Sequence, residues 1–308
     1  MNKKLNIALL VGLAAMSTLN VAQADEGRGF YVGAFGGAGR TDNQDVEQTG
    51  VAHKRGDFNG GFPDFDLLVD VKGSAKRETS GLAGVKLGYE WASMSANIKP
   101  AFELEMMYLG ANQNSSLANP NAEQLSHVVG EGTVGHDPVE LSAYVADHYR
   151  AGEHTFLNHM DMNIGLLMAN GVFTYETNSM FKPYAGVGIG LALVHMSGAS
   201  SVQTSPLGND SSIAAGCETT TSGGCVNHFN SKTNSNDYAI AGQVKLGLRA
   251  EINKNLSAFV EYRYLHINST EFTYGSTVYL DHSPTDNWNY KNGAMNFNNG
   301  LVGIEYAF

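Results

Sequence analysis

The chain has 308 residues and a formal net charge of −11, with 30 acidic against 19 basic side chains. This charge argues against a protein that holds nucleic acid or an anionic surface through its net charge. Glycine is abundant (36 residues), proline is scarce (7), and 14 tyrosines and 14 phenylalanines occur without long apolar runs after residue 24. Such a composition is typical of alternating strands joined by turns.

The first 24 residues, MNKKLNIALLVGLAAMSTLNVAQA, have the features of an export signal. Lys3 and Lys4 precede an apolar run, and Ala22 and Ala24 place small residues where a signal peptidase cleaves. The run is shorter than the roughly 20 apolar residues that a membrane-spanning helix needs. We therefore expect residues 1–24 to be a signal peptide and residues 25–308 to form one exported domain.

Alternation of apolar and polar residues with period two recurs about eight times along the exported part. Phe102, Leu104 and Met106, for example, lie opposite Glu103 and Glu105. This pattern predicts half-buried strands. The segments that show it are 29–38, 81–91, 102–108, 159–168, 184–194, 240–252, 260–264 and 300–308.

The connections between these segments alternate between long and short. Short ones lie near residues 92–97, 177–180 and 253–255, and the other four are long. Short turns at one end and long loops at the other are typical of bacterial transmembrane barrels. We therefore predict an all-β fold, an eight-stranded antiparallel up-and-down transmembrane β-barrel with four long extracellular loops, over residues 25–308. A soluble β-sandwich is the alternative, but it would have no reason to segregate loop lengths in this way.

Aromatic residues gather toward the ends of the segments, where the interfacial girdles of a membrane barrel belong. Examples are Tyr31, Tyr89, Trp91, Tyr184 and Phe308. The polar faces of the strands would then point into the lumen, which is narrow in a barrel of eight strands. The charged residues predicted to form a lumen network are Lys86, Glu90, Glu103, Glu105, Asp161, Lys245, Arg249, Glu251, Glu261, Arg263 and Glu305. They would form either a packed ion-pair plug or a gated narrow pore.

Three stretches carry a resemblance to a known family: FKPYAGVGIGLA (residues 181–192), GLRAEINKNLSAFVEYRYL (247–265) and GLVGIEYAF (300–308). From residue 29 to 308 the chain resembles the small outer-membrane β-barrel proteins, the eight-stranded class that includes the OmpA transmembrane domain and the Opa-like surface proteins. In that family the closing strand ends on an aromatic residue that resembles the signal read by the barrel-assembly machinery. The resemblance thus implies an assembly signal at Tyr306 and Phe308. It also implies a location in the outer membrane of a Gram-negative bacterium, with the loops at the cell surface.

Other candidate sites lie in the long connections. Cys217 and Cys225 are the only cysteines, and in an exported protein their spacing favours a local disulfide over a metal site. Residues 137–148 have the pattern of a short amphipathic helix. The histidines of the same connection, which do not repeat at ligand spacing, are His127, His136, His148 and His154. We interpret them as solvated and predict no metal and no cofactor.

His266 and Ser269 raise the question of enzymatic activity on lipid A, because lipid A deacylases use a His/Ser pair. In that family the serine lies two residues after the histidine, on the same strand face, whereas position 268 here is Asn. We therefore predict a protein without catalytic residues. Basic residues near the predicted outer rim could contact lipopolysaccharide phosphates or be ordinary solvated charges: Arg40, Lys76, Arg77, Arg150 and Lys232.

These patterns predict a surface protein whose barrel anchors large loops for structural, adhesive or partner-binding roles, since function often lies on loops held by a rigid scaffold. The expected partners are outer-membrane lipid, lipopolysaccharide, the barrel-assembly machinery and a host or cell-surface ligand of the loops. No nucleic acid is expected. The alternatives are a narrow ion or solute channel and, less favoured, a lipid A hydrolase.

Overall fold

The computed structural model describes residues 28–54, 65–94, 97–119, 124–128, 155–204, 225–280 and 282–308, and every regular element among them is a β-strand. No helix in these ranges is long and apolar enough to cross a membrane. The strands of this described part are β1 (Gly29–Thr41), β2 (Gln44–Lys54), β3 (Phe65–Ala75), β4 (Thr79–Glu90), β5 (Ile98–Ala118), β6 (Gln124–Val128), β7 (Thr155–Tyr175), β8 (Phe181–Thr204), β9 (Ser235–Glu251), β10 (Leu256–Ile267), β11 (Thr270–Tyr274), β12 (Trp288–Asn292) and β13 (Met295–Ala307).

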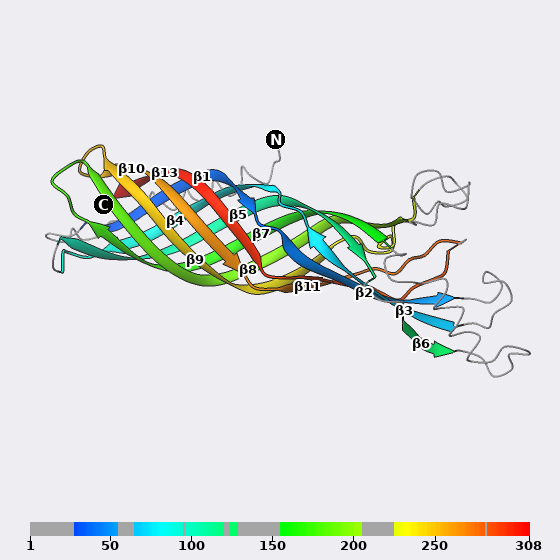
Figure 1. The fold of residues 1–308 in the computed structure, drawn as a ribbon. Coiled ribbons are helices and arrows are strands. Elements are labelled where there is room, and N and C mark those ends of the chain that lie inside the picture. Colours follow the sequence, from blue (N-terminus) through cyan, green and yellow to red (C-terminus); the bar gives the residue numbers. More distant parts are fainter. Residues whose placement is uncertain are drawn as a thin grey trace, which may run out of the picture.

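Eight of these strands close into a barrel (Figure 1). Each pairs antiparallel with its two neighbours in the ring β1–β4–β5–β7–β8–β9–β10–β13, and β13 returns to β1. Closure pairs every strand edge, which the hydrocarbon of a membrane requires because no water is there to satisfy the backbone. The predicted eight-stranded antiparallel barrel is confirmed.

The three predicted tight turns are also confirmed. Residues 176–180 and 252–255 join β7 to β8 and β9 to β10 at one end of the barrel, and β4 ends at Glu90 shortly before β5 begins at Ile98. The C-terminus lies at this same end, opposite β2, β3 and β6 (Figure 1). Where short turns mark the periplasmic side, the other end of the barrel is the outer one.

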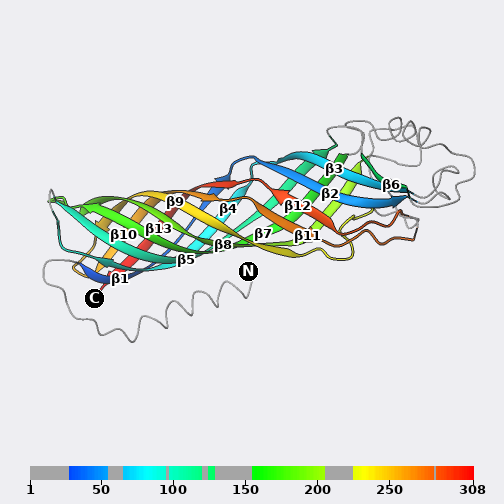
Figure 2. The same cartoon turned by 90° about the horizontal axis from the view of Figure 1, so that it is seen from below.

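The long connections at the outer end contain strands of their own. β2 pairs with β3, β11 pairs with β12, and β12 pairs with β2. β3 in turn pairs with the outer end of β5, from Lys72 opposite Ala118 to Ala75 opposite Ser115. The barrel wall therefore continues well beyond the ring (Figure 2). We call β2, β3, β11, β12 and the outer parts of β5, β7 and β8 the distal extension.

Alternation in the distal extension buries one face of each strand. In β3 the residues at odd positions from Phe65 to Val71 point inward, and Trp288, Tyr290 and Tyr274 pack inside from β12 and β11. These side chains are almost fully buried. The alternation of buried and exposed residues thus gives the distal extension an apolar interior. Burial of these side chains stabilises it without contact with lipid, as in a water-soluble β-protein.

One predicted strand face is reversed. We expected the apolar residues from Met160 to Met168 in β7 to face lipid, with His159 and Asp161 in the lumen. The structure buries Met160, Met162, Ile164, Leu166 and Met168 inside the barrel, and His159 and Asp161 lie outside. The reason is position along the axis, since this half of β7 belongs to the outer barrel and the distal extension, where the interior is apolar.

Candidate functional site

The outside of the barrel carries a band of exposed apolar side chains. Val187, Ile189 and Leu191 on β8 are 59–65% exposed, and Val302 and Ile304 on β13 are 62% and 56% exposed. Equivalent residues follow on β5, β9 and β10, so the band runs around the ring. A soluble monomer rarely exposes so large an apolar surface, whereas a barrel in lipid requires it. The chain is a transmembrane β-barrel.

Aromatic residues border the band at the periplasmic end. The rings of Phe30, Tyr89 and Trp91 stack edge to face, with centroids 4.8 and 5.2 Å apart, and Tyr306 meets Phe308 in the same way at 5.5 Å. Such a girdle marks the membrane–water interface. Tyr306 and Phe308 thus lie at the inner interface, Tyr306 on the strand that closes the ring and Phe308 directly after it.

At the outer end of the band, each of the eight ring strands changes from apolar to polar exterior residues. We call these residues the polar collar: Arg40, Thr79, Asn112, Asn163, His195, Asn236, His266 and Asn298. Several bond to one another or to nearby tyrosines, as His195 does with Asn236 and Tyr108 with Asn163. The collar therefore marks where the hydrocarbon ends and the headgroups begin.

The periplasmic half of the lumen holds a buried ion-pair network. Lys86 Nζ lies 3.1 Å from Glu103 Oε1 and 2.6 Å from Glu305 Oε1. Lys245 pairs with Glu103 and, at 2.7 Å, with Glu105. All of these side chains are at most 1% exposed.

Two arginines extend the network to the remaining acids. Arg263 Nη1 lies 3.1 Å from Glu105, and its Nη2 lies 2.6 Å from Glu261. Arg249 Nη1 lies 2.8 Å from Glu90, and its Nε lies 2.9 Å from Glu305. Burial of so many charges is tolerated only because each has a partner of opposite sign.

One member of the network was not predicted. Arg28 Nη1 lies 2.5 Å from Glu305, and Nη2 donates to Ser257 Oγ at 3.2 Å. Arg28 precedes the first alternating segment, so no strand pattern could assign it to the lumen. With the partly buried Arg28, five cations face five buried carboxylates: Arg28, Lys86, Lys245, Arg249 and Arg263 against Glu90, Glu103, Glu105, Glu261 and Glu305.

Two predicted network residues lie elsewhere. Asp161 faces outward because β7 presents its apolar residues to the interior at that level. Glu251 ends β9 at the periplasmic rim, where its side chain is 43% exposed and 3.8 Å from Lys182. Lys182 also pairs with Glu176, which Lys99 contacts at 2.8 Å. The rim cluster is separate from the lumen network.

Two aromatic residues expected at the interface point into the lumen instead. Tyr31 donates a hydrogen bond to Glu103 at 2.6 Å, and Tyr184 donates to Glu261 at 2.9 Å. Their rings lie over Gly88 and Gly247, where any Cβ would collide with the ring. These glycines are therefore required by the tyrosines opposite them.

Above the network the lumen becomes apolar. Met107, Leu109, Ile164, Leu166 and Leu265 fill this level and are at most 3% exposed. Farther out, amide groups pair inside the distal extension: Gln113 donates to Asn292 at 2.9 Å, and Asn158 donates to Gln48 at 2.7 Å. The interior of the described barrel thus changes from charged to apolar to polar amide, with side chains packed across it.

His266 and Ser269 do not form a catalytic pair. The ring of His266 lies on the outside of β10, with Nδ1 2.8 Å from Asn296 Oδ1 and Nε2 3.2 Å from Asn268 Oδ1. Ser269 follows the end of the strand and is exposed. The tyrosines that share this face, Tyr262 and Tyr264, point toward the membrane exterior as predicted.

Several predicted sites lie outside the described residues. They are the signal peptide, the helix over residues 137–148, Cys217, His136, His148, His154 and Arg150. His127 lies in β6, which pairs with β3. Within the part that the structure describes, no three His, Cys, Asp or Glu side chains are grouped so as to hold a metal ion.

The remaining predicted lipopolysaccharide contacts are exposed but dispersed. Arg40 belongs to the polar collar, whereas Lys76 and Arg77 lie between β3 and β4 and Lys232 precedes β9. Arg77 is 3.7 Å from Asp42, and Lys232 Nζ donates to the carbonyl of Thr273 at 3.3 Å. Only Arg40 among them lies level with the band edge.

The distal extension holds a histidine that sequence reasoning did not single out. His53 Nδ1 lies 2.6 Å from Asp66 Oδ1, and Nε2 lies 3.2 Å from Asp286 Oδ1. The hydrogen bond with Asp66, followed by that with Asp286, raises the pKa of His53 above its ordinary value, and partial burial opposes the rise. The imidazole thus joins β2, β3 and the connection between β11 and β12.

No family model matches the chain, and no curated protein matches its sequence. Three solved structures similar to it are the outer membrane protein OprG from Pseudomonas aeruginosa (13% identity, TM-score 0.35), Neisserial surface protein A (12%, 0.32) and the outer membrane protease OmpT from Escherichia coli (10%, 0.32). The alignments cover 91%, 91% and 95% of this chain and 96%, 97% and 100% of those chains, respectively.

Proposed function

We propose that this protein is a closed outer-membrane barrel of a Gram-negative bacterium that holds its distal extension and connecting loops away from the membrane, where they contact partners at the cell surface. The observation that carries this proposal is strand length. β5 and β7 have 21 residues each and β8 has 24. A strand needs only about 9–11 residues to cross the hydrocarbon, so these three continue about as far again outside it.

The interior supports a structural role for the barrel. Five cations and five carboxylates neutralise one another in the lumen, and an apolar layer follows them. Opening a path would separate buried ion pairs, which costs several kcal/mol for each charge left without a partner. A narrow channel is the alternative function, and the filled lumen disfavours it.

The exterior suggests further partners. The apolar band and the polar collar fit outer-membrane lipid and lipopolysaccharide, and Tyr306 and Phe308 on the closing strand fit recognition by the barrel-assembly machinery. The distal extension and the loops that it carries fit a host or cell-surface ligand. A disulfide between Cys217 and Cys225 would stabilise one of these loops. We propose no enzymatic activity, because His266 is engaged by two asparagines.

Surface labelling of intact cells tests the proposed orientation. Leu280, in the connection between β11 and β12, is 99% exposed, and Met94, which follows β4, is 78% exposed. In a background without the native cysteines, Leu280→Cys should react with a membrane-impermeant maleimide on whole cells, and Met94→Cys should react only after permeabilisation. The reverse pattern, or defined single-channel currents from the purified protein in planar bilayers, would refute the proposed function.

A further inference from the structure

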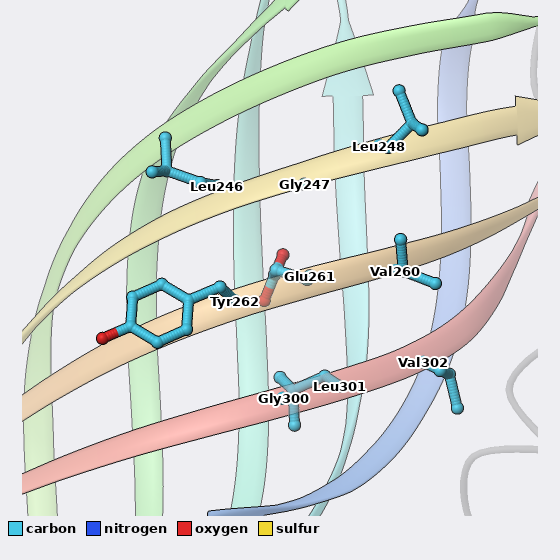
Figure 3. Close-up of a pocket in the computed structure, with 9 residues that line it drawn as sticks. All are labelled: Leu246, Gly247, Leu248, Val260, Glu261, Tyr262, Gly300, Leu301 and Val302. Atoms are coloured by element: carbon cyan, nitrogen blue, oxygen red, sulfur yellow. The ribbon is translucent and has the colours of Figure 1, made fainter.

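A shallow groove of about 550 Å³ lies on the outside of the barrel wall, where β9, β10 and β13 adjoin (Figure 3). Leu246 and Leu248 of β9, Val260 of β10 and Val302 of β13 project around it, and Gly300 lies where a side chain would otherwise fill it. The accessible walls are almost entirely apolar. The groove is continuous with the apolar band that faces lipid.

Gly300 creates the space. A Cβ built at this position would meet no heavy atom within 4 Å, so the backbone there opens directly to the outside. Its neighbours across the two adjoining strands are Tyr262 on β10 and Ala38 on β1. Tyr262 is one of the residues that line the groove, and on the other side of Gly300 Ala38 adds only a methyl group.

A polar cluster borders the outer end of the groove. Asn298 lies two residues from Gly300 on the same face of β13, toward the outer end of the barrel. It pairs with Tyr264 on β10 and with Arg40 on β1. Tyr262 donates to Asn298 Oδ1 at 2.6 Å, and Tyr264 donates to Asn296 Oδ1 at 2.8 Å. An apolar groove therefore runs directly into hydroxyl and amide groups.

The charge of the cluster is specific to this side of the barrel. Arg40 is the only residue of the polar collar with a permanent charge, and its side chain is exposed. A guanidinium can hold a phosphate through two parallel hydrogen bonds, and it is less strongly hydrated than a lysine ammonium. The polar collar thus offers a strong phosphate ligand next to this groove.

We propose that this face binds one phosphorylated glycolipid of the outer leaflet. An acyl chain lies in the groove over Gly300, the sugar hydroxyls meet Asn296 and Asn298, and a phosphate meets Arg40. This inference rests on the proposed outer-membrane location and names a site for the lipopolysaccharide expected as a partner. A phospholipid has no sugar hydroxyls to bond with the asparagines of the polar cluster, so it fits this face less well than a glycolipid. A second copy of the chain fits less well too, because it would place an apolar surface against the polar cluster.

Native mass spectrometry of the purified full chain tests the site, with lipid A or phosphatidylethanolamine added in turn. Gly300→Leu fills the groove, and Arg40→Gln removes the phosphate ligand. Gly165→Leu is the matched control, because Gly165 is also open to the outside and lies on β7, four strands from β13 in either direction around the ring. All three changes face away from the lumen, so the barrel should still form.

The wild-type chain and Gly165→Leu should retain lipid A in preference to phosphatidylethanolamine, and the two site variants should weaken its retention by about tenfold, the effect of one charge-assisted hydrogen bond or a blocked apolar contact. Equal loss in Gly165→Leu, unchanged retention in Gly300→Leu, equal retention of both lipids, or a lipid-free dimer would overturn the inference. A correctly oriented protein in the labelling experiment that binds no lipid A would refute this site alone and leave the display function standing.

Discussion

At the scale of single residues, three carboxylates of the lumen network each pair with more than one cation: Glu103, Glu105 and Glu305. Glu105 contacts Lys245 at 2.7 Å and Arg263 at 3.1 Å, and Gln243 donates to it at 2.8 Å. Glu305 similarly joins Arg28, Lys86 and Arg249. Because these three acids are shared, loss of the charge on any one of them removes more than one ion pair at once.

Removing the charge of Glu105 should therefore destabilise the barrel strongly. Glu105→Gln leaves Lys245 and Arg263 with one carboxylate each, and breaking a buried ion pair costs about 3–5 kcal/mol. Urea titration of the protein in lipid vesicles, followed by the loss of heat-modifiable gel mobility, measures this free energy of unfolding.

Glu251→Gln is the matched control for this prediction. Glu251 ends β9 at an alternating position of the inward face but lies at the exposed rim, so its change should stay within about 0.5 kcal/mol. Equal effects of the two substitutions would mean that the buried network contributes no more to stability than a surface charge does.

At the scale of the strands, period-two patterning predicted the eight ring strands and their three tight turns. Both features depend on residues that are close together in the sequence. It failed where the environment changes along one strand. In β5 the outward residues are apolar as far as Tyr108, whereas beyond it Leu109 and Leu117 are buried inside and Asn114 lies outside. The same change of environment occurs in β7, where Asp161 was predicted to face the lumen but lies outside. Alternation alone does not say which face of a strand meets lipid.

The strands of the distal extension were not predicted for a related reason. Phe65, Leu67 and Val69 are apolar at alternate positions of β3, but they fall in a connection that the spacing of the ring strands had assigned to a loop. Arg28 had no local pattern at all, and the pairing of His53 with Asp66 and Asp286 joins residues 13 and 233 positions apart. Such contacts depend on the register between β2, β3 and a distant connection.

His53 should make the attachment of that connection depend on pH. Its pKa is raised above 6.5, so the charged form stabilises the contact fully below pH 6.5, and the contribution is lost as pH rises through the folded-state pKa. NMR titration of the His53 ring should give a midpoint above 6.5. Because the hydrogen bond with Asp66 is the largest cause, Asp66→Asn should lower the midpoint more than Asp286→Asn does.

The substitution His159→Gln serves as the control for this titration, because His159 bonds to Asn114 on β5, away from His53. It should leave the His53 midpoint where it is. A His53 midpoint at or below 6.5 in the wild-type chain, or equal effects of the two aspartate variants, would contradict the assignment. The side chain of His53 is 37% exposed, so solvent screening limits the stabilisation that accompanies the shift.

At the scale of the whole molecule, the membrane barrel and the distal extension share three strands, although their outer surfaces meet opposite environments, lipid and water. Between the girdle and the polar collar the apolar residues face out and the charges face in, whereas beyond the collar the apolar residues face in. β5, β7 and β8 pass through both environments without a break. The two parts therefore have separate sources of stability: lipid contact and ion pairs in one, a buried aromatic core in the other.

This separation predicts that the distal extension can be disrupted while the membrane barrel stays folded. Trp288 is 1% exposed, packs against Phe156 with ring centroids 5.9 Å apart, and donates from Nε1 to Thr277 Oγ1 at 3.2 Å. Trp288→Ala should cost the distal core about 3–5 kcal/mol and make it sensitive to added protease on intact cells. The unboiled band of the same variant should keep its heat-modifiable shift, because that shift reports the eight-stranded ring. Loss of both properties together would mean that the ring and the distal extension fold as one cooperative unit, and resistance to protease would mean that the aromatic core does not hold the distal extension together.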